Sequence, residues 1–577
     1  MHWLIAPAAL LIGATALAQP TDRFVPVTDV MLADPDPADW LMWRRTFDNW
    51  GYSPLDQIDV RNVAELGLVW TRGLGPGDQE GTPLVHDGVM YFPHPNDLTQ
   101  AFDAATGDMI WEYRRPLPAD VGEYISSSTR NRNLAIYGTL ILDNSNDGYA
   151  YAIDARTGEL AWETHIIDYR QGARHSSGPI IVNGKAVSGR SCRPAGGPEA
   201  CVITAFDAET GREAWRTHTI PRPGEPGDET WGDVPYDERR HVGTWMVPSY
   251  DPELNQIYIG TSVTSPAPKF MLAGNDEQYL YHNSTLALDG DSGRIVWYFQ
   301  HLVDHWDLDH SFERLLLDTV VAPNADAVPW INRRLQPDQS RKVLTGIPGK
   351  TGLVYTLDRE TGEFLWARET VDQNVVAEIN TESGAAIVNS EKLYTRAGQE
   401  LLICPGALGG KNYPAGTYSP LTGLMYFPLQ NTCMMSESVA ETPSLDDVYA
   451  IRTRARLAPG VENVGTIEAI SVLSGDTEWK REQRAGTLSL ISTGGGLLFG
   501  GDVNGRFRAY DQRDGTVLWE VNLGSPVNGY PATYEVDGRQ YITVSTGGSG
   551  LAFGLARLTP ELRPGAGNQL YVFALPE

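Results

Sequence analysis

One eleven-residue motif recurs along the chain and constrains its fold more than any other feature. Each copy has an Asp position, a Gly a few residues later, and a Trp eight residues after the Asp position; Ser471 replaces the Asp in one copy. This spacing is typical of two short strands joined by a tight turn at the Gly. The seven copies occupy residues 101–111, 152–162, 205–215, 287–297, 356–366, 469–479 and 509–519.

Such a hairpin cannot bury both of its faces alone. The Gly supplies the positive φ that the turn requires, and the Trp is a large apolar plate that packs against a neighbouring sheet. Successive copies must therefore stack on one another, and radial stacking of four-stranded sheets produces a β-propeller. The repeat predicts an all-β fold with tryptophan-docking blades.

The spacing of the copies suggests one more blade than the motif itself marks. The 113 residues between Asp358 and Ser471 leave room for an extra blade, and residues 417–431 are expected to form its hairpin. Residues 66–70 are expected to pair with residues 571–575 and close the ring. We therefore predict a single eight-bladed domain over residues 19–577, with a seven-bladed ring as the alternative.

The N-terminus has the pattern of a secretory signal. Residues 4–17 are apolar and end in a small-x-small site, so cleavage is expected after Ala18. An uncleaved anchor is the less favoured alternative, because the apolar stretch is shorter than the roughly 20 residues of a membrane-spanning helix. We predict a signal peptide over residues 1–18, export to the periplasm, and no membrane span.

Export also changes the interpretation of the four cysteines. Four cysteines allow three pairings, and the simplest joins sequence neighbours, Cys192 with Cys201 and Cys404 with Cys433. Their spacing matches no zinc site, and no CxxCH motif for covalent haem is present. We prefer two structural disulfides.

The formal net charge of -28 argues against nucleic acid or anionic lipid as a partner. Such acidity suits a soluble exported protein. It either attracts a basic redox partner or serves solubility alone.

Segments between the repeats are more specific than the repeats. They include DHWDLD at residues 304–309, GTWMVPSYDPELN at 243–255 and IPGKTGLVYTLDR at 347–359. With these segments the chain resembles the pyrroloquinoline-quinone-dependent alcohol dehydrogenases of the methanol and ethanol dehydrogenase type. Within that family it is most similar to the soluble sorbose and alcohol dehydrogenases.

The resemblance implies a role for several residues. Asp307 is expected to be the catalytic base, accepting the alcohol proton while hydride leaves for the quinone. Lys350 would contact the quinone oxygens and stabilise their growing charge, and Trp245 would form the floor under the quinone ring. Further cofactor contacts are expected from Glu80, Thr82, Arg132, Ser176 and Asn412.

The chain departs from the family pattern in two places. Ser126 and Ser127 replace the adjacent cysteines that lie above the quinone in many members. The family's Glu and Asn metal ligands fall at Pro194 and Val263, neither of which has a side-chain oxygen.

A metal site is nevertheless expected from the resemblance. Asp309 matches an extra Asp that accompanies lanthanide use in some members. Asp307, Asp309 and Thr264 are the predicted ligands of Ca²⁺, with a lanthanide as the alternative and Glu199 as another substitute oxygen donor.

The sequence thus predicts a periplasmic quinoprotein that oxidises primary or secondary alcohols, polyols or sugars. Because no haem motif is present, electrons should pass to a separate acceptor, such as a soluble cytochrome c or a quinone-type acceptor. A non-catalytic scaffold for outer-membrane protein assembly is the main alternative. Such scaffolds often carry a lipid-modified Cys after the signal, where this chain has Gln19 and Pro20. A carbohydrate-binding propeller is a further alternative.

Overall fold

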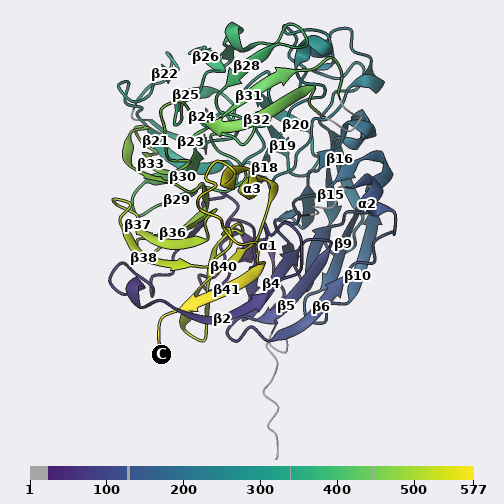
Figure 1. The fold of residues 1–577 in the computed structure, drawn as a ribbon. Helices are drawn as coiled ribbons and strands as arrows, with labels where there is room; N and C mark the ends of the chain where they lie inside the picture. The colour runs from purple at the N-terminus through teal and green to yellow at the C-terminus, as the bar shows by residue number, and fades with distance from the viewer. Residues whose placement is uncertain (1–23, 126–129, 338, 443–447) are drawn as a thin grey trace, which may run out of the picture.

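The computed structural model describes residues 24–125, 130–337, 339–442 and 448–577. The predicted signal peptide and the Ser126–Ser127 pair lie outside the described residues. Strands make up most of the regular structure, which confirms the all-β prediction (Figure 1). The α-helices of the described part are short: α1 (Asp29–Ala33), α2 (Val121–Tyr124) and α3 (Gly550–Ala556).

Eight sheets of four or five strands make up the body of the described chain. The first four copies of the motif each lie in the last two strands of an antiparallel sheet. These sheets are β3 (Leu84–His86), β4 (Val89–His94), β5 (Leu98–Asp103) and β6 (Met109–Arg114); β7 (Ala135–Tyr137), β8 (Leu140–Asn144), β9 (Tyr149–Asp154) and β10 (Leu160–His165); β12 (Ile180–Val182), β13 (Lys185–Ser188), β15 (Val202–Asp207) and β16 (Glu213–His218); and β17 (Ser249–Asp251), β18 (Gln256–Gly260), β19 (Ser284–Asp289) and β20 (Ile295–Gln300).

The last three copies each belong to a sheet of their own as well. These sheets are β21 (Leu315–Val321), β23 (Gln339–Gly346), β24 (Leu353–Asp358), β25 (Phe364–Glu369) and β22 (Trp330–Ile331); β29 (Thr417–Ser419), β30 (Leu424–Gln430), β33 (Gly465–Ser471) and β34 (Thr477–Gln483); and β1 (Tyr52–Ser53), β35 (Thr487–Thr493), β36 (Leu497–Asp502), β37 (Arg506–Asp511) and β38 (Val517–Asn522).

The eighth sheet joins the two ends of the described chain. Its order is β2 (Gly67–Gly73), β41 (Gln569–Ala574), β40 (Arg539–Thr546) and β39 (Ala532–Val536). Leu68 pairs with Phe573 and Trp70 with Val572, and Figure 1 shows the yellow strand β41 beside the purple strand β2. The predicted pairing of residues 66–70 with 571–575 is confirmed.

The predicted extra blade at residues 417–431 is wrong, although its hairpin forms. Thr417 pairs with Tyr426 in the β29–β30 hairpin, but β30 then pairs with β33, so the hairpin belongs to the sheet of the sixth copy. The residues between β30 and β33 form an insertion that carries β31 (Thr432–Ser438) and β32 (Ile451–Leu457). A second insertion, between β25 and β29, carries β26 (Val376–Ile379), β27 (Ala386–Val388) and β28 (Glu400–Ile403), and β28 pairs with β31. A smaller pair, β11 (Ala173–Arg174) and β14 (Ser191–Cys192), lies in an earlier connection.

The tryptophans of the motif contact the turn of the following sheet. The Trp111 indole N–H donates to the Ala155 carbonyl at 2.9 Å, and the Trp519 indole N–H donates to the Leu66 carbonyl, just before β2, at 3.1 Å. The same kind of bond joins Trp162 to Ala208, Trp215 to Gly290, Trp297 to Arg359 and Trp479 to Gln512, and it also joins Trp70, outside the motif copies, to Ala104. The indole N–H of Trp366, in the fifth copy, has no partner among the described residues. Each of these bonds fixes one sheet against the next.

The turn glycines of the motif leave room for these indoles, and this gives a first prediction. Gly158 has φ +73°, and a Cβ there would lie 2.8 Å from the Trp111 ring. Gly423 has φ +69° with nothing within 4 Å of such a Cβ. We expect Gly158→Ala to lower the free energy of unfolding by about 1–3 kcal/mol more than Gly423→Ala, because only the former crowds an indole. Denaturant unfolding followed by fluorescence measures both; equal losses would show that the indole contact contributes nothing.

Both predicted disulfides are confirmed. Cys192 and Cys201 are joined with their Cα atoms 5.0 Å apart, and Cys404 and Cys433 with theirs 4.3 Å apart. No helix in the described ranges is long and apolar enough to cross a membrane.

Candidate active site

A cavity of about 360 Å³ collects most of the residues that the sequence singled out. Its walls come from loops that follow or precede strands of several sheets, where the insertions between motif copies lie. A volume of this size suits one small organic molecule. The lining residues are Arg130, Arg132, Arg174, Ser176, Ser191, His241, Trp245, Asp309, Lys350, Ala407, Leu408, Asn412, Tyr413, Val448, Tyr449 and Leu551.

Trp245 presents its indole to the cavity from the segment that precedes β17. The indole N–H donates to Asp309 Oδ2 at 3.2 Å, and the ring packs edge-on against Phe312 at 5.6 Å. The hydroxyls of Ser176 and Ser177 donate to the Trp245 backbone carbonyl at 3.0 and 2.9 Å. The indole is therefore held at its edge and at its backbone, and Ser176 acts through it.

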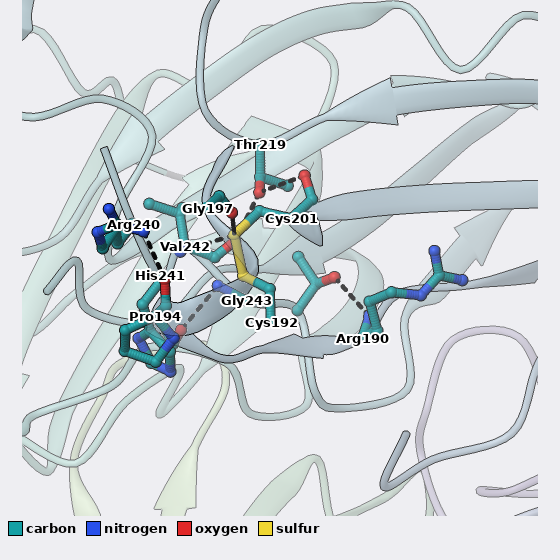
Figure 2. The surroundings of a disulfide bond; sticks show 12 residues. Arg190, Cys192, Pro194, Gly197, Cys201, Thr219, Arg240, His241, Val242 and Gly243 are labelled. Atoms are coloured by element: carbon teal, nitrogen blue, oxygen red, sulfur yellow. Dashed lines mark hydrogen bonds between the residues drawn. A yellow bond between two sulfur atoms is a disulfide. The ribbon is translucent and has the colours of Figure 1, made fainter. Parts of the chain in front are cut away.

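The Cys192–Cys201 disulfide lies beside residues 240–243, which precede Trp245 in the chain (Figure 2). The Val242 amide donates to Cys201 Sγ at 3.4 Å, and the Val242 carbonyl accepts the Thr219 hydroxyl at 2.5 Å. The Arg240 guanidinium donates to the Pro194 carbonyl at 2.9 Å. The disulfide loop thus fixes the residues that lead into Trp245.

Arg132 and Glu80 form a buried ion pair beside the cavity. Their N–O distance is 2.6 Å, and their side chains are 1% and 0% exposed. The Arg132 guanidinium also donates to the Ser176 carbonyl at 3.0 Å and lies over the rings of Trp245 and Tyr413, 5.0 and 4.9 Å from their centroids. Glu80 is absent from the cavity lining and instead holds Arg132 in place. Thr82 also lies behind Arg132, with its amide donating to the Arg132 carbonyl at 2.9 Å.

Two further arginines line the cavity that the sequence did not single out. Arg130 pairs with Asp78 at 2.9 Å. Burial, together with the charges of Arg130 and Arg132, lowers the pKa of Arg174 to about 10. Three guanidiniums around one small cavity favour an anionic ligand. Both lie between motif copies, where no repeated sequence pattern distinguishes them from ordinary surface arginines.

Asp307 contacts Lys350 and Tyr449 through one oxygen. The Lys350 ammonium donates to Asp307 Oδ1 at 2.5 Å, and the Tyr449 hydroxyl donates to the same oxygen at 2.6 Å. Burial raises the pKa of Asp307 to about 7, with Lys350 opposing this rise and Asp309 adding to it. Asp307 is not part of the cavity lining, but its side chain is 20% exposed and bonds Lys350 and Tyr449, which both line the cavity. Its backbone has φ 74°, an uncommon conformation for a residue other than Gly.

Asp309 is surrounded by hydrogen-bond donors. Its Oδ1 accepts the Val263 amide at 3.0 Å, its Oδ2 accepts the Trp245 indole N–H, and the Lys350 ammonium lies 3.8 Å from Oδ2. Thr264 does not join it: the Thr264 hydroxyl donates to the Arg240 carbonyl at 2.7 Å, and Thr264 is not part of the cavity wall.

Glu199 lies elsewhere, paired with Arg222 at 2.9 Å and bonded to Tyr236 at 2.7 Å. In the described ranges no three His, Cys, Asp or Glu side chains are grouped to hold a metal ion. The ligand set expected from the sequence is therefore not assembled, because the hydroxyl of Thr264 and the carboxylate of Glu199 are used elsewhere.

His241 and Asn412 complete the polar lining. His241 Nδ1 bonds to the Val263 carbonyl at 2.7 Å, and its backbone has φ 57°. Asn412 donates to the Leu408 carbonyl at 3.0 Å and accepts the Tyr413 amide. Asn412 was predicted, whereas His241 and Tyr449 were missed, because single residues in insertions have no periodic signal.

The donor set of the cavity fits pyrroloquinoline quinone, the cofactor that the resemblance implies. That molecule is planar, with carboxylates at its edge and quinone oxygens on its ring. An indole, three guanidiniums and one ammonium line the cavity, and they match a flat ring, carboxylates and a polar carbonyl respectively. The same lining does not fit Ca²⁺ or a lanthanide, which require many free oxygen donors.

Comparisons with known proteins also indicate a quinone-dependent alcohol dehydrogenase. Residues 40–384 and 461–542 match the PQQ family described as "Glucose/ethanol/alcohol dehydrogenase, beta-propeller domain". Quinohemoprotein alcohol dehydrogenase ADH-IIG of Pseudomonas putida is 33% identical over 95% of this chain and 77% of its own length. Quinoprotein alcohol dehydrogenase PedH of Pseudomonas putida is 30% identical over 91% of this chain and 89% of its own length. The solved structure of a europium-containing methanol dehydrogenase matches with a TM-score of 0.84 and 26% identity, covering 95% of this chain and 99% of that one.

Proposed function

This chain belongs to the family of pyrroloquinoline-quinone-dependent alcohol dehydrogenases, and from that premise we propose that its cavity binds the quinone and oxidises an alcohol with Asp307 as the base. The observation that carries the proposal is one cavity lined by the indole of Trp245, by three guanidiniums and by Lys350, whose ammonium pairs with Asp307. A protein that served only as a scaffold would have no use for this combination.

The charged and aromatic residues at the cavity have separate parts in the proposed reaction. Trp245 supports the flat face of the cofactor, and Arg130, Arg132 and Arg174 bind its carboxylates. Asp307 accepts the hydroxyl proton of the alcohol. When bound, the quinone supplies a two-electron acceptor for the hydride of the alcohol carbon. Lys350 orients Asp307 by donating a hydrogen bond to Oδ1. Among the described residues no donor bonds Oδ2, so this oxygen is the one that accepts the proton.

The pKa of Asp307 predicts the pH dependence of the reaction. A general base acts only in its ionised form, and burial raises this carboxyl to a pKa of about 7. We expect kcat/KM to rise about tenfold per pH unit below pH 7 and to level off above it. Steady-state rates in buffers of constant ionic strength check this. A profile that is flat down to pH 5, where an ordinary Asp is still ionised, would contradict the raised pKa.

The proposal extends to architecture and location. We propose that residues 19–577 form one domain in which each of the eight sheets is a blade docked by its tryptophans. Cleavage of residues 1–18 would deliver it to the periplasm; the two disulfides support an oxidising compartment.

The substrate and the electron acceptor also belong to the proposal. We propose primary or secondary alcohols, with polyols and sugars included, as substrates. All four cysteines are in disulfides, which leaves none for covalent haem within these 577 residues. This supports transfer of electrons to a separate acceptor, such as a cytochrome c or a quinone-type acceptor. Neither Ca²⁺ nor a lanthanide is part of the proposal, because their donor set is not assembled among the described residues.

Reconstitution tests the proposed function. The purified protein is stripped of cofactor, supplied with pyrroloquinoline quinone and assayed for alcohol oxidation with an artificial dye as acceptor. We expect activity that requires the quinone, with alcohols of different size ranking the substrates. If the protein neither binds the quinone nor oxidises any alcohol, the dehydrogenase proposal fails and a scaffold function returns.

A further inference from the structure

The carboxylates nearest the cavity face hydrogen-bond donors instead of an open cation site. Both oxygens of Asp309 accept N–H groups, from the Val263 amide at 3.0 Å and the Trp245 indole at 3.2 Å. An amide and an indole can only donate. Each oxygen of Asp309 therefore already has a hydrogen-bond donor without a bound ion.

The Lys350 ammonium lies between the two carboxylates. It is 2.5 Å from Asp307 Oδ1 and 3.8 Å from Asp309 Oδ2, and its side chain is 8% exposed. One fixed positive charge therefore faces both carboxylates. A divalent cation placed between the same oxygens would be repelled by this ammonium at close range.

The oxygens that the sequence suggests as further metal ligands already take part in hydrogen bonds. The two positions where the sequence register places the family's metal ligands have only backbone carbonyls to offer. The Pro194 carbonyl accepts the Arg240 guanidinium at 2.9 Å, and the Val263 carbonyl is bonded by His241 Nδ1 at 2.7 Å. The next oxygens, those of Thr264, are also used: its hydroxyl donates to the Arg240 carbonyl, and its carbonyl accepts the Lys269 ammonium at 2.7 Å.

The described residues offer few side-chain oxygens for such an ion. Ca²⁺ takes about six to eight oxygen ligands. Of the predicted ligands only Asp307 and Asp309 lie together, and the Lys350 ammonium is 2.5 and 3.8 Å from their oxygens. In the described ranges no third His, Cys, Asp or Glu side chain joins them to hold a metal ion.

We infer that this chain supplies the positive charge beside the quinone oxygens itself, through the ammonium of Lys350, and that it binds the quinone without a divalent or trivalent metal ion. The inference rests on the proposed function. Lys350 is a compact point charge that can donate hydrogen bonds both to Asp307 and to a ligand oxygen in the cavity. Negative charge that grows on a quinone oxygen is stabilised by such a preorganised donor.

Quinone binding in the absence of metal tests the inference. The apo-protein is dialysed against a chelator and titrated with pyrroloquinoline quinone, and binding is followed by quenching of tryptophan fluorescence. We expect the Kd to agree within about twofold in chelator, in excess Ca²⁺ and in excess La³⁺. We also expect elemental analysis of the reconstituted protein to find no stoichiometric metal.

The outcomes separate the inference from the proposed function. Binding that needs Ca²⁺ or La³⁺, with about one ion per chain, overturns the inference and leaves the dehydrogenase proposal intact. No binding under any of the three conditions overturns the proposed function itself.

Two substitutions at Lys350 test the source of the charge. We expect Lys350→Met, which keeps the length of the side chain without its charge, to weaken quinone binding in chelator by at least about tenfold, or about 1.4 kcal/mol. Lys350→Arg keeps the charge and should stay within about threefold of the unaltered protein. Equal affinity of the Met variant and the unaltered protein would show that the ammonium is not the cation in question. Thermal unfolding of each variant separates a lost contact from a lost fold.

Discussion

Asp307→Asn is expected to lower kcat by about 10²–10⁴-fold while the quinone remains bound. The amide keeps the size of the side chain and one oxygen for the donors Lys350 and Tyr449, which bind Oδ1 at 2.5 and 2.6 Å. It cannot accept the hydroxyl proton, so the loss should appear in kcat. Stopped-flow reduction of the bound cofactor by alcohol isolates this step, and fluorescence quenching confirms that the cofactor is present.

Tyr449→Phe serves as the matched comparison. It removes one donor from Asp307 Oδ1 and leaves the carboxylate in place. Because a lost hydrogen bond no longer favours the charged form, the pKa of Asp307 should rise, and the pH profile should move to higher pH with a small loss at high pH. If Asp307→Asn retained activity comparable with Tyr449→Phe, Asp307 would not be the base.

Arg132→Ala is expected to lower the free energy of unfolding by about 3–5 kcal/mol and to abolish quinone binding. The substitution removes the short ion pair of Glu80, which is 0% exposed, and leaves this buried carboxylate with only the guanidinium of Arg130 at 3.9 Å. It also removes the guanidinium that lies over the rings of Trp245 and Tyr413. Denaturant unfolding measures the first effect and quinone titration the second.

Arg156→Ala is the control for this prediction, because its pair has the same length in a different environment. Arg156 and Asp154 are also 2.6 Å apart, but their side chains are 48% and 20% exposed. We expect a change of about 0–1 kcal/mol and unaltered quinone binding. Similar losses in both variants would mean that burial of the Arg132–Glu80 pair does not determine its contribution.

The sequence predicted the fold where the motif repeats and at the pairing of the two chain ends, but it failed at one pairing across an insertion. Each Trp and each turn Gly of the motif lies in a hairpin, because local spacing alone determines such a unit. The predicted hairpin at residues 417–431 also forms, but the prediction that it belongs to an extra blade was wrong. Strand β30 pairs with β33, whose first residue, Gly465, pairs with Gln430 across a long insertion, and no local pattern records that pairing.

The candidate site was predictable where residues lie in motifs shared with relatives. Trp245 and Lys350 were predicted in this way, and both line the cavity. Arg174 and Tyr449 were not, because each is a single residue between motif copies that no repeated pattern marks. Thr264 was predicted as a ligand from its neighbourhood in sequence, yet its hydroxyl bonds the Arg240 carbonyl instead. Proximity in sequence does not determine where a side chain points.

The sheet shared by β2 and β41 has a consequence for how the chain reaches its native state. Strand β2, residues 67–73, pairs with residues 569–574. Its sheet therefore contains one strand that is synthesised early and can be completed only when the C-terminal strand has been synthesised. Until then β2 and β40 each expose an unpaired edge, the kind of surface through which chains aggregate. Contacts so distant in sequence also slow folding. Folding of this protein should therefore depend on holdase chaperones until strand β41 has been synthesised.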